Sequence, residues 1–197
     1  WSLPEPTMDY YTDAVMSSAK ALSGTAVIVI GRSGGENADL PADMYAVIHG
    51  TYDVAATDQV MESVAHNYNY TRATFYNNTY GQANGYDEFN EGEHYLQLSM
   101  TERKLVDLVT SSFEKVIVVI NANNPMELGW VNEYPNIGAV ILAPGTGTSG
   151  MSALGSILKG EVNPSGKTVD TFLYSLKDAP TWNHSGNSGN HLYNNVG

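Results

Sequence analysis

The sequence predicts an α/β fold in which a doubly wound, mostly parallel sheet is sandwiched between helices, in three layers (α/β/α). Three short runs, at residues 26–30, 116–120 and 137–142, are almost continuously apolar, as in strands that are covered on both faces. Helical stripes separate these runs, and strands that alternate with helices are typical of doubly wound sheets. Because 197 residues suffice for one core, we expect a single domain over residues 1–197.

The first half of the chain is expected to supply two helices around the first strand. Thr12 is a suitable N-cap for a helix over residues 12–22. Further along, Ser99 and Glu102 have the spacing of a capping box, and they precede an apolar helical stripe that ends at Phe113.

The second half continues the alternation. Asn124 as an N-cap and Pro125 at the first helical position predict a short helix that runs through Trp130. A helix over residues 151–159 and a fourth strand over residues 168–173 complete the predicted domain.

Two stretches interrupt the pattern. Residues 49–94 form a long insertion rich in aromatic residues and asparagine, with one short helix expected near residues 58–66. Its aromatic side chains suit either the stacking of sugar rings or packing against a neighbouring domain. Residues 182–197, rich in Asn, Ser and Gly, are expected to be a flexible tail. Because the chain begins at Trp1, we expect it to be a fragment of a larger enzyme.

The composition excludes several classes of function. Nine Lys and Arg against twenty-one Asp and Glu give a net charge of -12, which disfavours nucleic acid and anionic membrane surfaces as partners. The chain has no cysteine, and its five histidines show no metal-ligand spacing, so we expect no metal and no cofactor. A neutral ligand such as a sugar is compatible with this charge. The compartment, cytoplasmic or secreted, stays open.

A glycine-rich segment, Gly31–Pro41, directly follows the first predicted strand. Its glycines permit sharp turns that could lift Glu36 clear of the sheet as a proton donor. Arg32 and Asp39 could hold this loop through a bidentate pair. The alternative is that Glu36 merely caps a turn or faces solvent.

Residues 145–150 match the G-x-G-x-x-G pattern, and Asp170 lies about twenty residues further on, as in dinucleotide-binding domains. However, the pattern follows the third strand rather than the first, and Asp170 falls inside the next predicted strand. The alternative is tight packing between strand and helix, with Ser149 as the N-cap. A nucleotide-binding domain is therefore the least favoured interpretation.

Polar side chains also follow the strand at residues 116–120. Asn123 could bind a sugar hydroxyl, although capping a helix is the more common use of asparagine at such a place and is the favoured interpretation. Glu127, in the first turn of the predicted helix, suits the helix dipole without any catalytic role.

Read together, these segments resemble the family 3 glycoside hydrolases. The resemblance covers most of residues 24–48 and 95–175, and the aromatic insertion lies outside it. The segments that carry it are Gly31-Arg32-Ser33-Gly34-Gly35-Glu36-x-Ala38-Asp39-Leu40-Pro41, Tyr95-Leu96-x-Leu98, Val116-Ile117-Val118-Val119-Ile120-Asn121, Asn124-Pro125-Met126-Glu127-Leu128, Ala143-Pro144-Gly145-x-Gly147-x-Ser149-Gly150 and Gly160-x-Val162-Asn163-Pro164-Ser165-Gly166-Lys167.

The resemblance implies a retaining β-glycosidase, similar to a β-glucosidase, in which a TIM-like barrel carries the aspartate nucleophile. The sandwich domain then supplies the general acid/base, and Glu36 is the matching position. Asn37 stands where the family usually has glycine. We expect Arg32, Asp39 and Asn123 to contact the substrate, a β-linked glucoside or similar carbohydrate. Without the barrel and its nucleophile, the chain by itself is expected to be inactive.

Overall fold

The computed structural model describes residues 7–32, 89–94, 96–123, 125–147 and 149–180. Within these ranges the sheet has three parallel strands in the order β1-β2-β3. These strands are β1 (Thr25–Arg32), β2 (Lys115–Ala122) and β3 (Ile137–Leu142). All three predicted runs therefore form strands, and the prediction of a parallel sheet in an α/β fold is confirmed.

Two longer helices flank the strands along the chain. Helix α1 spans Asp13–Leu22, and α6 spans Met100–Ser112. Both begin where the sequence predicts, since the Thr12 side chain accepts from the Val15 amide at 3.3 Å and Ser99 and Glu102 form a complete capping box. A short 3-10 helix, η1 (Met8–Tyr10), precedes α1.

The core lies between one face of the sheet and helix α6. Alternate residues of β1 and β2 point towards this helix, and the helix turns its apolar stripe to them. Val106 and Val118, on opposite sides of this contact, are completely buried. The core cluster comprises Met16, Ile28, Ile30, Leu98, Val106, Val109, Phe113, Val116, Val118, Ile120 and Met126.

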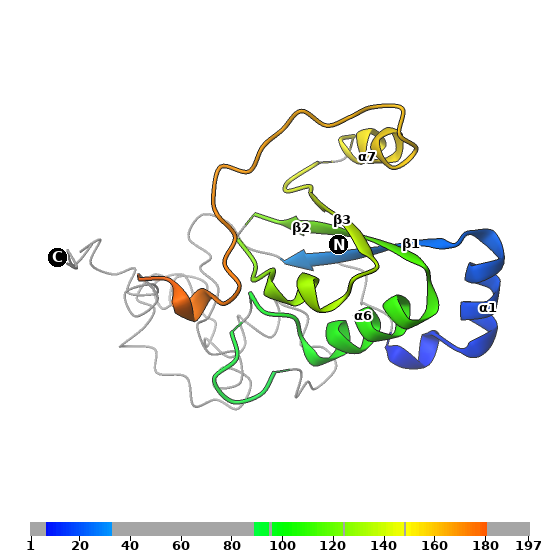
Figure 1. The fold of residues 1–197 in the computed structure, drawn as a ribbon, viewed down its shortest axis with the longest axis horizontal. Helices are drawn as coiled ribbons and strands as arrows, with labels where there is room; N and C mark the ends of the chain where they lie inside the picture. Colours follow the sequence, from blue (N-terminus) through cyan, green and yellow to red (C-terminus); the bar gives the residue numbers. More distant parts are fainter. Residues whose placement is uncertain (1–6, 33–88, 95, 124, 148, 181–197) are drawn as a thin grey trace, which may run out of the picture.

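Helix α7 (Met151–Leu158) lies apart from this core, on the other side of the strands from α6 in Figure 1. None of its residues is buried. Helices that appear on both sides of a parallel sheet are consistent with the three-layer arrangement. Gly160, with a φ of +74°, follows the helix end, where a positive φ favours glycine. In the described ranges no helix is long and apolar enough to cross a membrane.

Two predicted elements are wrong. The segment at residues 168–173 is not a strand: Val169 is 97% exposed, and the Leu173 carbonyl accepts from the Leu128 amide instead of joining the sheet. No α-helix opens at Pro125 either: residues 125–128 are irregular, and the Leu128 amide, which would make the first hydrogen bond of such a helix, donates to the Leu173 carbonyl. A 3-10 helix, η3 (Gly129–Glu133), forms later instead. A final 3-10 turn, η4, spans Leu176–Asp178.

Candidate functional site

The carboxyl ends of the three strands meet at one edge of the sheet. Arg32 at the end of β1 lies in register with Ala122 at the end of β2, and Ile120 pairs with Leu142 at the end of β3. Ligands of open α/β sheets bind outside this edge. We call it the carboxyl edge and look there for the residues that the sequence singles out.

Arg32 is buried at the carboxyl edge and makes a bidentate ion pair with Glu102. Its Nη1 and Nη2 atoms each lie 2.5 Å from one carboxylate oxygen, and the two side chains are only 5% and 7% exposed. Nη2 also donates to the Gln97 carbonyl at 2.7 Å. The sequence suggested Asp39 as the bidentate partner. Asp39 lies outside the described residues, and among the residues that the structure describes the bidentate partner is Glu102.

Glu102 has a second task at the start of α6. Its Oε2 atom accepts from the Ser99 amide at 2.8 Å, while its own amide donates to the Ser99 hydroxyl at 3.2 Å. The carboxylate therefore joins the first turn of α6 to the end of β1. The capping box was evident in the sequence, but its second role required knowledge of which strand lies next to the helix.

A second buried polar pair lies where the long insertion returns to the fold. The His94 Nε2 atom is 2.9 Å from Glu127 Oε1, and both residues are buried. The His94 Nδ1 atom accepts from the Leu96 amide at 3.2 Å. A neutral imidazole with Nδ1 as acceptor carries its proton on Nε2, so His94 donates to the Glu127 carboxylate. The Glu127 side chain is thus tied to the segment that contains His94. Glu127 does not lie in the first turn of a helix, as we had expected.

Asn123 lies exposed after β2, beside the loop that follows β3. Its Oδ1 atom is 3.4 Å from the place that a Cβ atom on Gly145 would take. Gly145 and Gly147 have φ angles of +57° and +60°, a conformation that favours glycine. The glycines therefore let this loop turn sharply beside the exposed side-chain amide of Asn123. Because no α-helix begins at Pro125, Asn123 caps no helix there.

Of the four predicted site residues, the structure describes Arg32 and Asn123, both at the carboxyl edge. Glu36, like Asp39, lies outside the described residues. The dinucleotide interpretation loses its geometric basis, because Asp170 is exposed and does not end a strand. Gly150, not Ser149, is the N-cap residue of α7, and it makes no side-chain cap.

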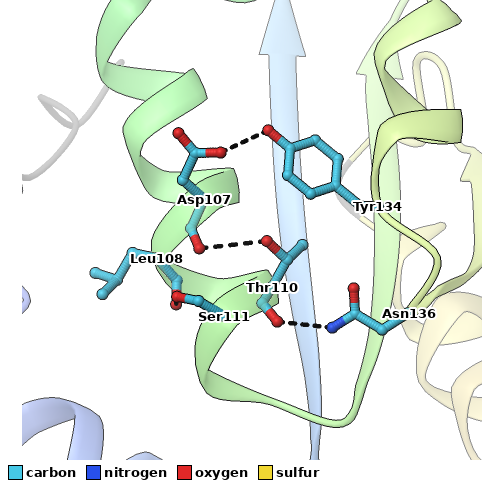
Figure 2. Close-up of a pocket in the computed structure, with 6 residues that line it drawn as sticks. All are labelled: Asp107, Leu108, Thr110, Ser111, Tyr134 and Asn136. Atoms are coloured by element: carbon cyan, nitrogen blue, oxygen red, sulfur yellow. Dashed lines mark hydrogen bonds between the residues drawn. The ribbon is translucent and has the colours of Figure 1, made fainter.

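The opposite edge of the sheet carries a shallow hollow beside the last turns of α6 (Figure 2). The Tyr134 hydroxyl donates to Asp107 Oδ1 at 2.6 Å, and the Asn136 amide donates to the carbonyls of Thr110 and Phe113 at 2.7 and 2.8 Å. Partial burial, reinforced by the neighbouring Asp107 carboxylate, raises the pKa of Tyr134 from 10.0 to about 12. These bonds fasten α6 to the turn before β3. In the described ranges no group of three or more acidic or histidine side chains is arranged to hold a metal.

Comparisons with known proteins agree on one family. The model of the glycosyl hydrolase family 3 C-terminal domain matches residues 8–195. Beta-glucosidase A of Butyrivibrio fibrisolvens is 30% identical over 167 residues, which are 85% of this chain and 17% of that protein. A probable beta-glucosidase L of Aspergillus terreus is 37% identical over 79 residues, or 40% of this chain and 11% of that protein.

A solved structure shares the fold. The crystal structure of a beta-glucosidase from Paenibacillus barengoltzii aligns with a TM-score of 0.56 at 23% identity, over 92% of this chain and 14% of the solved chain. This chain therefore spans only 17% of the length of the Butyrivibrio protein and 14% of the solved Paenibacillus chain.

Proposed function

This chain belongs to the glycosyl hydrolase family 3 C-terminal domain family, and we propose that it supplies the general acid/base, Glu36, of a retaining β-glucosidase. The observation that carries the proposal is the position of Glu36 in the sequence. It stands in a glycine-rich segment that directly follows β1, and that strand ends at the edge where α/β sheets bind ligands.

The proposed reaction needs a second carboxylate from outside this chain. Retaining glycosidases hold two carboxyl groups about 5–5.5 Å apart, one to attack the anomeric carbon and one to protonate the departing oxygen. We assign the attack to an aspartate of a TIM-like barrel in the full-length protein. Glu36 donates its proton to the glycosidic oxygen as the bond to the anomeric carbon breaks. The resulting Glu36 carboxylate then takes a proton from the water that releases the sugar from the aspartate.

Two of the other predicted residues, Asn123 and Asp39, are proposed to contact the substrate. Asn123 presents an exposed amide at the carboxyl edge, beside the loop at Gly145, and an amide can both donate to and accept from sugar hydroxyls. Asp39, in the same glycine-rich segment as Glu36, is proposed to contact the substrate too. The ligand is a β-linked glucoside or a similar neutral carbohydrate, which a chain with a net charge of -12 does not repel.

The decisive experiment compares Glu36→Ala with Glu133→Ala in the full-length enzyme. With a dinitrophenyl β-glucoside, whose leaving group needs no protonation, Glu36→Ala should release one rapid equivalent of phenolate and then turn over slowly. General acid/base catalysis typically contributes about 10²–10⁴-fold, so the slow phase should fall by that order. Glu133, an exposed carboxylate in η3, is the matched control and should behave as wild type.

Two results would contradict the proposal. If Glu36→Ala turns over the dinitrophenyl and phenyl glucosides at wild-type rates, the acid lies elsewhere and this domain is a carbohydrate-binding or structural module. If Glu36→Ala and Glu133→Ala lose activity equally, the effect belongs to the fold and not to Glu36. Mixing the separately produced chain with substrate tests the accompanying proposal that the domain alone is inactive.

A further inference from the structure

The pair between Arg32 and Glu102 joins three parts of the chain that are distant in sequence. Arg32 ends β1, Glu102 lies 70 residues later in the first turn of α6, and Gln97 precedes that helix. The guanidinium binds both carboxylate oxygens and the Gln97 carbonyl, at 2.5 to 2.7 Å. The buried Arg32 guanidinium therefore ties the end of β1 to the start of α6.

The carboxylate of Glu102 is held from two directions. Arg32 occupies both of its oxygens, and the Ser99 amide donates to Oε2 as well. A bidentate arginine–carboxylate pair fixes the relative orientation of its two planes, which a single hydrogen bond does not. Rotation of the Arg32 side chain would leave the buried Glu102 carboxylate without its counter-ion.

Stability alone does not account for a charged pair at this place. A buried ion pair often contributes no more to stability than a well-packed apolar pair of similar volume, because both ions lose their hydration. What the pair supplies is a defined geometry. The residue that it holds, Arg32, ends β1 and lies near the start of the glycine-rich segment Gly31–Pro41.

We propose that Arg32 and Glu102 are positioning residues for Glu36. This inference rests on the proposed function. Glu36 is four residues beyond Arg32, so its Cα atom lies within about 14 Å of the Arg32 Cα atom. Only residues 33–35 separate Arg32 from Glu36 in the sequence. The fixed end at Arg32 therefore limits where Glu36 can stand. In this account Arg32 acts through the loop, and Glu102 acts through Arg32.

The test is the dependence of kcat/KM on the leaving group in the full-length enzyme. Phenyl β-glucoside needs protonation of its leaving oxygen, whereas dinitrophenyl β-glucoside does not. Glu102→Gln keeps the shape and the capping box, since glutamine also serves at that position, but it removes the charge that pairs with Arg32. A misplaced acid should lower the rate on phenyl glucoside roughly tenfold more than the rate on dinitrophenyl glucoside, which is part of the loss expected for a missing acid.

Three further variants make the result decisive. Arg32→Lys keeps the charge and loses the fork, so it should show the same uneven loss if Glu102→Gln does not fold. Tyr134→Phe, at the opposite end of α6, should lower both rates equally or not at all. Equal losses on both substrates for Glu102→Gln and Arg32→Lys would overturn the positioning role. Glu36→Ala is the reference for the proposed function: even rates on the two substrates there would refute that function, whatever Glu102→Gln does.

Discussion

The two ends of helix α6 are tied to the sheet by different chemistry. At its first turn, Glu102 makes a buried ion pair with Arg32. Near its last turn, the uncharged side chains of Tyr134 and Asn136 are the donors. Tyr134 donates to the exposed Asp107 carboxylate and Asn136 to the Thr110 carbonyl (Figure 2), and Asn136 also donates to the Phe113 carbonyl. Bonds from uncharged donors suffice to dock this helix end, and an exposed carboxylate keeps its hydration, whereas a buried ion pair carries a desolvation cost. The charged end is the one that adjoins the proposed catalytic loop.

The largest effect that this comparison predicts is at the charged end. Arg32→Met leaves Glu102 buried without its counter-ion, and removal of one partner of a buried pair costs roughly 3–5 kcal/mol. Hydrogen exchange of the α6 amides in the full-length protein should show a loss of protection of that order. The double variant Arg32→Met/Glu102→Met should recover much of it, because no buried charge remains. If the single and double variants lose the same protection, the pair stabilises the fold by packing and not by charge.

A smaller effect is expected at the other buried polar pair, His94 and Glu127. His94→Ala removes the donor to Glu127 and the acceptor of the Leu96 amide. A buried group left without its partner costs about 1–3 kcal/mol, seen as lower exchange protection of residues 96–98. His94→Gln, which can still donate to Glu127, should recover part of the loss. Equal losses in both variants would show that the imidazole matters for its shape alone.

The smallest effect is expected near the last turn of α6, at Tyr134, and it depends on pH. The pKa of Tyr134 is about 12 in the folded protein against 10.0 in the unfolded chain. Above pH 10 the unfolded state loses the tyrosine proton first, so the contribution of Tyr134 is complete below pH 10 and is lost between pH 10 and 12. Tyr134→Phe should flatten the melting temperature of the domain over that window. An unchanged slope would mean that neither burial nor the neighbouring Asp107 raises the pKa of Tyr134.

The strands were predictable because each is apolar on both faces, a pattern that short-range sequence alone displays. The capping box at Ser99 was predictable for the same reason, since its two residues are three positions apart. The fourth strand failed because residues 168–173 bond through Leu173 to Leu128, a pairing that depends on how the chain returns. Pro125 suits a helix start, yet the Leu128 amide, which would make the first hydrogen bond of that helix, donates to the Leu173 carbonyl instead.

Site residues were harder to predict than elements. Arg32 could be singled out from its place after a strand, but its partner Glu102 is 70 residues away, and nothing local distinguishes Glu102 from a carboxylate that only caps its helix. Glu127 was expected only to suit a helix dipole, and no role was predicted for His94, because their contact also joins distant segments. Long-range pairing of polar groups has no periodic signal in a single sequence.

The central claim is that Glu36 supplies the acid/base, and the product formed by Glu36→Ala in the presence of azide tests it most directly. Without the base, the glycosyl-enzyme intermediate hydrolyses slowly, and azide attacks it without needing proton removal. NMR of the product from a dinitrophenyl β-glucoside should show a β-glucosyl azide, with turnover restored as azide increases. Unchanged hydrolysis with no glycosyl azide would show that Glu36 is not the acid/base.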